Sequence, residues 1–349
     1  METFSSSDSV GPQRRATMRD VAAVAGVSLS TVSRVVNGSG AVAPEALRRV
    51  QDATALLGYR PDRRASALRR SDGRSGLIGL VVDDVANPFF SQLHRGVDEV
   101  LTAHGSVALV AGSGRDPRRE DEILSAFSSH GVDGLIVAPA GPETGALERE
   151  RRAGVPVVVV DRAPRDSTFD SVMADNAAGV TAAVEALTAA GHRRIAFLGG
   201  RRGITSTEQR LEGFRTALVA PGGYDDALVL TEVEEEGLPH RLDAMLAGQR
   251  APSAIVSTQN VITEWTLRHL HARNLQHRVG VVGFDDVPLA ELLDPPLSTV
   301  IADPAEIGRE AARILLDRLD ESGPQELQAR VVATRLVLRG SERVGVPVE

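Results

Sequence analysis

From residue 77 onward the chain alternates short aliphatic runs with stretches of helical periodicity, and this alternation restricts the fold more than any other feature. Strands that are aliphatic on both faces are typical of parallel sheets covered by helices on both sides. The roughly 270 residues of this region exceed one ordinary core, so we expect an α/β core with two doubly wound parallel sheets in tandem. The predicted strands span residues 77–82, 106–111, 134–138, 155–161, 195–199, 254–257, 279–284 and 331–338.

Residues 17–58 have a different pattern, which predicts three short helices. The first helix ends before Gly26, where a C-cap requires a positive φ, and Ser28 can cap the second helix. The third begins at Pro44 and ends near Gly58. Two helices joined by a tight glycine turn, the second presenting short polar residues and an arginine, are typical of a helix-turn-helix. The predicted inner faces consist of Val21, Ala22, Val24 and Ala25, then Val32, Val35 and Val36, then Leu47, Val50, Ala53 and Thr54.

Charge is distributed unevenly between these two regions. All 39 basic residues are arginines, and residues 1–76 hold 12 of them against 7 acidic residues. The remainder holds 27 arginines against 40 acidic residues, which gives the whole chain a net charge of −8. A basic small region on an acidic body indicates that the small region meets an anionic partner, although a mildly basic small domain with no such role would look the same.

Several classes of protein are excluded by composition and motif. The chain has no cysteine, so it contains no disulfide, thiolate metal site or cysteine nucleophile. The polar first 16 residues resemble neither a signal peptide nor a membrane span, so we expect a soluble, cytoplasmic chain with a disordered tail. The glycines at 199–203 lack the order of a dinucleotide loop, and the 8 histidines have no metal spacing. We expect no enzyme, no cofactor and no metal.

Seven segments place particular residue types at fixed spacing. The helix-turn-helix reads DVAAVAGVSLSTVSRVVN at 20–37, and YRPDRRASAL follows at 59–68. The core contains NPFF at 87–90, VDR at 160–162, STEQRLEGF at 206–214, VGFDD at 282–286 and DPPLST at 294–299. Together they closely resemble the LacI/GalR family of bacterial transcriptional regulators over nearly all of residues 17–340.

The resemblance implies a DNA-binding headpiece, a hinge helix and an effector-binding core of the type I periplasmic-binding-protein kind. The chain of such a core passes between two subdomains three times, which we place near residues 174, 302 and 328. The expected divisions are a tail at 1–16, a helix-turn-helix domain at 17–60, a hinge helix and linker at 61–76, and a core at 77–349. Within the core, the first subdomain covers about 77–173 and 303–327, and the second about 174–302 and 328–349.

A recognition helix enters the major groove with its N-terminus first, so Leu29 and Ser30 should approach base edges, with Arg34 one turn later. The alternative for Arg34 is a surface ion pair. Short donors suit phosphate oxygens, which fix position without reading sequence. These donors are Ser28, Thr31, Ser33 and Asn37, and the resemblance adds Thr17, Tyr59 and Ala65 to the DNA-binding set.

The predicted hinge helix, residues 62–70, is too short to be stable in water on its own, and its arginines repel one another. It should therefore fold only when phosphates neutralise those arginines and a partner covers its apolar face. The resemblance implies that Leu68 from each of two subunits wedges into the minor groove and kinks the duplex. The alternative is an ordinary linker leucine.

Ligands of doubly wound sheets bind beyond the carboxyl ends of the strands, where the core motifs lie. Carboxylates and guanidinium groups there suit the hydroxyls of a sugar, and an aromatic face suits its C–H side. The alternatives are core packing for the two phenylalanines, surface exposure for Arg162, and a turn or cap for Asp285. The predicted effector-binding residues are Asn87, Phe89, Phe90, Asp161, Arg162, Ser206, Arg210, Gln259 and Asp285.

Two departures from the family pattern leave the effector open. Residues 258–260 read Thr-Gln-Asn where the family often has Ala-Asn-Asp, and Ala302-Asp303 stands where it often has a glutamine. Trp265 is expected in the core rather than against a ligand. The resulting hypothesis is a repressor that binds a pseudo-palindromic operator as a homodimer, or as a tetramer, and responds to a sugar-like inducer. The alternatives are a corepressor, a protein partner, or a sugar-binding protein with the same core.

Overall fold

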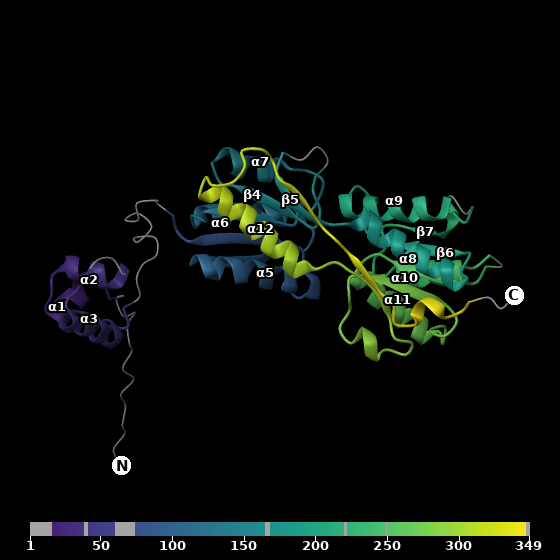
Figure 1. Cartoon of the computed structure of the whole chain (residues 1–349), viewed down its shortest axis with the longest axis horizontal. Helices are drawn as coiled ribbons and strands as arrows, with labels where there is room; N and C mark the ends of the chain where they lie inside the picture. The colour runs from purple at the N-terminus through teal and green to yellow at the C-terminus, as the bar shows by residue number, and fades with distance from the viewer. Residues whose placement is uncertain are drawn as a thin grey trace, which may run out of the picture. The chain divides into compact units, whose positions relative to one another are not determined.

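The computed structural model describes residues 16–37, 41–59, 74–164, 168–219, 222–248 and 250–346. The chain forms two compact units that divide between Ser75 and Gly76, and each is described by itself (Figure 1). The predicted hinge helix falls outside the described residues.

The first unit is a three-helix domain, which confirms the predicted helix-turn-helix. Its helices are α1 (Met18–Ala25), α2 (Leu29–Asn37) and α3 (Pro44–Leu57). Helix α1 ends at Gly26, whose φ of 63° is the left-handed conformation expected there, and α3 ends at Gly58 in the same way. The core gathers one face of each helix and consists of Val21, Ala25, Val32, Val50, Ala53 and Tyr59. Val24 and Leu47, expected on the inner faces, are instead exposed.

The second unit contains two six-stranded sheets, so the predicted α/β core with two sheets is confirmed (Figure 1). The first sheet has the order β11-β5-β4-β3-β1-β2, and all its pairs are parallel. Its strands are β1 (Leu77–Val82), β2 (Val107–Gly112), β3 (Gly134–Val137), β4 (Val157–Val160), β5 (Asp170–Ala174) and β11 (Ala329–Val332). Its helices are α5 (Pro88–His104), α6 (Pro117–Ser129), α7 (Gly145–Arg152) and α12 (Pro304–Leu319).

The second sheet has the order β12-β10-β9-β8-β6-β7. Its strands are β6 (Ile195–Leu198), β7 (Val229–Leu230), β8 (Ala254–Ser257), β9 (Gly280–Phe284), β10 (Ser298–Ile301) and β12 (Arg335–Val337). Its α-helices are α8 (Asn176–Ala190), α9 (Thr205–Val219), α10 (Leu238–Leu246) and α11 (Asn260–Ala272). Short 3₁₀ helices lie at Asp226–Leu228, Ala290–Leu292 and Ser341–Arg343. Strand β12 runs antiparallel to β10, so the expectation of a purely parallel sheet is wrong at this edge.

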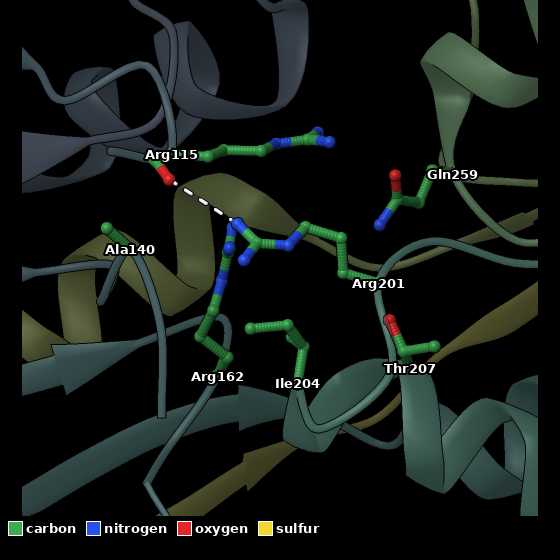
Figure 2. Close-up of a pocket in the computed structure, with 7 residues that line it drawn as sticks. All are labelled: Arg115, Ala140, Arg162, Arg201, Ile204, Thr207 and Gln259. Carbon is green, nitrogen blue, oxygen red and sulfur yellow. Dashed lines mark hydrogen bonds between the residues drawn. The ribbon is translucent and has the colours of Figure 1, made fainter. Parts of the chain in front are cut away.

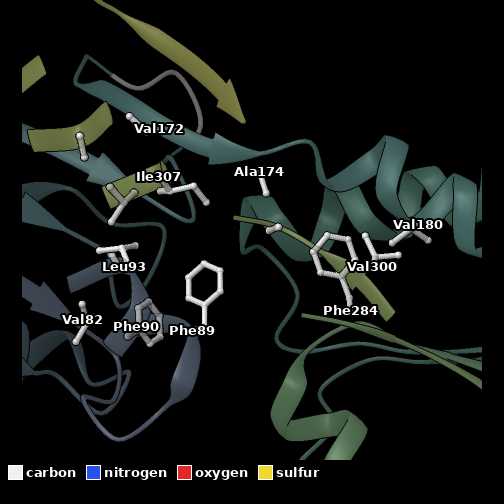
Figure 3. Close-up of a cluster of buried hydrophobic side chains, with 14 of the residues drawn as sticks. Val82, Phe89, Phe90, Leu93, Val172, Ala174, Val180, Phe284, Val300 and Ile307 are labelled. Carbon is white, nitrogen blue, oxygen red and sulfur yellow. The ribbon is translucent and has the colours of Figure 1, made fainter. Parts of the chain in front are cut away.

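Helices cover both faces of each sheet, as the aliphatic strands require. Helices α5 and α12 pack together on one face of the first sheet, and α6 and α7 lie on the other. Gly96 and Gly308 allow α5 and α12 to approach closely, because a Cβ at Gly308 would lie 2.1 Å from the Leu93 carbonyl oxygen. One buried cluster runs from this face into the second subdomain, from Phe90 through Ala174 to Phe284 (Figure 3). Trp265 packs against a second cluster beneath α10 and α11, as expected.

The chain passes between the sheets at three places. Two of them, between β5 and α8 and between β10 and α12, lie where the sequence indicates. The third lies at residues 333–334, later than the expected position near 328. The predicted strand 331–338 is in fact two strands, because β11 pairs with β5 in the first sheet before β12 joins the second.

No described helix combines the length and the apolar character needed to cross a lipid bilayer.

Candidate functional site

The exposed face of α2 carries the residues expected to approach DNA. The Ser28 Oγ accepts a hydrogen bond from the Thr31 backbone N–H at 3.2 Å, which makes Ser28 the cap of α2. Its hydroxyl also pairs with those of Ser30 and Thr31, each at 2.8 Å. Leu29 is 46% exposed. Arg34 is exposed and forms no ion pair with any described residue, so the ion-pair alternative has no partner there.

The other predicted DNA-binding residues differ in their surroundings. Thr17 caps α1 in a reciprocal capping box with Asp20, so its side chain stabilises the first helix. Tyr59 is buried in the core of the first unit. Ser33 is half-buried, and Asn37 is the last residue of α2. Ala65 and Leu68 lie outside the described residues.

A pocket lies between the two subdomains of the second unit, at the carboxyl ends of their strands (Figure 2). The first subdomain contributes the loops after β2, β3 and β4, and the second contributes the loops after β6 and β8. Three of the lining residues are arginines whose side chains converge on this space (Figure 2). The lining residues are Arg115, Ala140, Arg162, Arg201, Ile204, Thr207 and Gln259.

The side chain of Arg162 is only 11% exposed, so the surface alternative for this residue is wrong. Its Nη2 lies 2.7 Å from Asp83 Oδ2 and 2.9 Å from Asp161 Oδ2. Burial disfavours the charged guanidinium, but these two carboxylates outweigh that effect and raise the pKa of Arg162. Asp83 also binds the Nε of Arg115 at 3.0 Å, so one carboxylate serves two arginines. Asp161 adopts a φ of 64°, which turns the chain directly after β4.

Arg210 occupies the buried floor of the second subdomain. Its Nε donates to Asn176 Oδ1 at 2.8 Å, and its Nη1 donates to the carbonyl oxygen of Thr258. The guanidinium carbon lies 3.8 Å from the centroid of the Phe284 ring. Burial lowers the pKa of Arg210, and the Asp285 carboxylate opposes this effect.

Asp285 and Gln259 present unpartnered acceptors. Burial raises the pKa of Asp285 to about 6, which Arg210 opposes and Asp161 reinforces. Within the described structure, Asp285 Oδ1 and Gln259 Oε1 are buried and accept no hydrogen bond. A buried acceptor without a donor is costly, so a ligand that donates hydroxyl groups would relieve both. Neither side chain of this pair acts as a helix cap.

Asn87 connects the two subdomains. It caps α5 by accepting the Phe89 N–H at 2.9 Å, and it exchanges two amide hydrogen bonds with Asn260 at the start of α11. Phe89 and Phe90 are both buried in the main core cluster, which is the packing alternative (Figure 3). Ser206 is buried in the first turn of α9.

The sequence analysis missed several residues of this site. Those with charged or amide side chains are Asp83, Arg115, Asn176, Arg201 and Asn260, and the pocket wall adds Ala140, Ile204 and Thr207. Asp83 directly follows β1, as Asp161 follows β4, so its position at a strand end was available in the sequence. Arg115 and Arg201 each follow a glycine shortly after a strand. Their meeting depends on how two separate sheets face each other.

Known protein families match residues in each of the two units. Residues 17–62 match the family described as "Bacterial regulatory proteins, lacI family", and residues 184–342 match the "Periplasmic binding protein-like domain". The chain is 36% identical over 335 residues to the "HTH-type transcriptional regulator PtxS" of Pseudomonas plecoglossicida, a match that covers 94% of this chain and 96% of that protein.

Solved structures share the fold over nearly the whole chain. A transcriptional regulator CelR–cellobiose complex is 31% identical, with a TM-score of 0.69, and the match covers 94% of this chain and 100% of that one. The Lac repressor dimer bound to operator and the anti-inducer ONPF is 24% identical, with a TM-score of 0.80, and the match covers 94% of this chain and 99% of that one.

Proposed function

Since the chain belongs to the lacI family of bacterial regulatory proteins, we propose that it is a sequence-specific repressor controlled by a small molecule. The observation that carries this proposal is the exposed face of α2. Ser28 caps its N-terminus, and Ser28, Leu29, Ser30 and Arg34 are all exposed. A duplex would receive this helix in its major groove, with Arg34 able to donate two hydrogen bonds to a guanine.

Two such helices in a symmetric dimer require two inverted half-sites, so the operator is a pseudo-palindrome and the protein acts as a homodimer inside the cell. The hinge segment, residues 61–76, folds on the operator, and Leu68 enters the minor groove. We assign the parts of this repressor to the divisions of the chain that the resemblance implies. The one change is that the third connection between the subdomains lies at residues 333–334.

The effector binds between the subdomains. Asp161, Arg162, Arg210, Gln259 and Asp285 supply polar groups from both sides. The buried acceptors without a donor in the described structure, which at this site are Asp83 Oδ1, Gln259 Oε1 and Asp285 Oδ1, fit a ligand with several hydroxyls. The CelR structure, a relative solved as a complex with cellobiose, supports a carbohydrate as the class of effector. A ligand that favours one relative orientation of the subdomains changes the spacing of the two hinges and thereby the affinity for the operator.

The test is to select operators from a random duplex pool with the purified full-length protein, and to measure affinity by fluorescence anisotropy. We expect an inverted repeat, and an affinity that falls steeply as salt rises, because phosphate contacts release counterions. A sugar library is then screened for ligands that raise the melting temperature and alter operator affinity. Selection of no shared sequence would refute the proposed DNA-binding function.

A further inference from the structure

The wall of the cleft is unusually rich in positive charge. Arg115, Arg162 and Arg201 reach the same pocket from three different loops and from both subdomains (Figure 2). A neutral sugar needs few such groups, because its hydroxyls both donate and accept, whereas a guanidinium only donates. Three guanidinium groups around one space therefore favour a ligand that brings anionic acceptors.

The carboxylates within reach neutralise only two of these three arginines. Asp83 and Asp161 together bind Arg162, and Asp83 also binds Arg115. Arg201 forms no ion pair with any residue of the described ranges, and its one hydrogen bond there is a long contact of 3.5 Å to the Arg115 carbonyl oxygen. Arg210 and Asp285 belong to the same site and add one charge of each sign, so one positive charge remains in excess.

Glu120 does not remove that excess. Its Oε2 accepts the Ala140 backbone N–H at 2.6 Å behind the pocket wall, and burial raises its pKa to about 7. It therefore carries only part of a charge at neutral pH. Arg202, the neighbour of Arg201, differs in being paired, because its Nε lies 2.9 Å from Glu208. Arg202 also does not line the pocket.

We infer that the effector is a polyhydroxyl compound that carries an anionic group, a carboxylate or a phosphate, and that Arg201 together with Arg115 and Arg162 binds this group. The inference rests on the proposed function and specifies the ligand class of the same cleft. The hydroxyls face the free acceptors of Asp285 and Gln259, while the anion takes the donors that no carboxylate of the chain uses.

The experiment compares ligands that share hydroxyls and differ in charge. Isothermal titration of the full-length protein uses aldoses, the matching aldonates and the matching sugar phosphates, with inorganic phosphate as the charge-only probe. We expect one of the two anionic series to bind at least about tenfold more tightly than its neutral aldose, and to lose that advantage in high salt. The two series distinguish carboxylate from phosphate.

Two variants that each lose one positive charge test whether Arg201 is the arginine that binds the anionic group. Arg201→Gln should reduce affinity for the anionic ligand about tenfold and leave affinity for the neutral aldose almost unchanged. Arg202→Gln should change neither. Equal binding of neutral and anionic ligands, or equal effects of the two variants, would overturn the inference while leaving a sugar-responsive repressor in place. Failure of every compound to bind or to alter operator affinity would overturn the effector proposal itself, and the inference with it.

Discussion

Asn87 and Asn260 hold each other across the cleft by two amide hydrogen bonds, although 173 positions separate them in the sequence. The Asn87 Nδ2 donates to Asn260 Oδ1 at 3.3 Å, and the Asn260 Nδ2 donates to Asn87 Oδ1 at 2.7 Å. Each residue stands at the start of a helix, α5 in the first subdomain and α11 in the second. The pair thus links the two subdomains in the orientation that the structure shows.

Breaking this pair should weaken the binding of any ligand that needs this relative orientation of the subdomains. Asn87→Ser keeps an acceptor for the Phe89 N–H, so α5 retains its cap, and Asn260→Ala removes the opposite amide. We expect each variant to reduce effector affinity about fivefold, and the double variant to reduce it hardly further, which corresponds to a coupling energy of about 1 kcal/mol. Titration calorimetry on the four proteins measures the cycle. Additive losses would show that the two amides act independently.

Replacing Arg34 should relax sequence preference rather than weaken all binding. If Arg34 binds a guanine in the major groove, Arg34→Ala costs about 1–3 kcal/mol at one position of each half-site and little elsewhere. Anisotropy with operators changed one base at a time, at constant salt, measures this. Arg48→Ala removes a charge from α3 of the same unit and serves as the control. A uniform loss on every sequence would reassign Arg34 to a phosphate.

Replacing Leu68 should reduce DNA bending. A leucine wedge unstacks a base step, so Leu68→Ala should lower both operator affinity and the bend angle reported by energy transfer between dyes at the duplex ends. Leu56→Ala is the control, because Leu56 is 77% exposed on α3 and belongs to no proposed wedge. An unchanged bend angle with Leu68→Ala would remove the wedge from the mechanism.

Glu120 should make stability fall as pH rises. Burial raises its pKa from 4.5 to about 7, so between these values the folded protein keeps a proton that the unfolded chain has lost. Its contribution is complete below pH 4.5 and is lost as pH rises through about 7. Glu120→Gln should therefore gain stability relative to the original protein over this range, by up to about 1.4 kcal/mol per pH unit.

Denaturant unfolding of both proteins at several pH values tests this expectation. Glu122→Gln, which removes an exposed carboxylate from the same helix, is the matched control. A difference between the Glu120→Gln and original proteins that does not change with pH would mean that Glu120 is ionised in the folded state throughout.

Gly308 should tolerate no side chain. Its Cβ would collide with the backbone of α5, so Gly308→Ala forces the α5 and α12 helices apart and should destabilise the second unit by about 1–3 kcal/mol. Gly145→Ala, at the start of α7, is the control, because a Cβ there would meet nothing within 4 Å. Thermal unfolding measures both, and equal melting temperatures would show that the helix pair adjusts without cost.

The elements that the sequence predicts well are those specified by local chemistry. Gly26, Ser28, Pro44 and Gly58 mark helix ends because each meets a local backbone requirement. The edge strands of the two sheets were harder to predict from the sequence. Strand β7 has two residues, and β11 and β12 read as one aliphatic run because nothing local shows that the chain changes sheets between them.

The residues of the candidate site likewise fall into those that the sequence could place and those that it could not. Asp161, Arg162, Arg210 and Asp285 lie together as their motifs imply, because each follows a strand or lies near the start of a helix at the carboxyl edge. Arg201, Arg115 and the Asn87–Asn260 pair depend on how two sheets face each other. That orientation is set by tertiary packing, and no local pattern in the sequence contains it.

The position of the three connections between the subdomains determines which end of the first sheet lies farther from them. The chain passes between the subdomains at residues 174–176, 302–303 and 333–334, and all three connections lie at the carboxyl edge of the first sheet. Strand β1 begins at Leu77, where the chain arrives from the first unit, and ends at Val82, beside the cleft. Any rotation of the first subdomain about the three connections would therefore displace Leu77 more than Val82, because Leu77 lies farther from them.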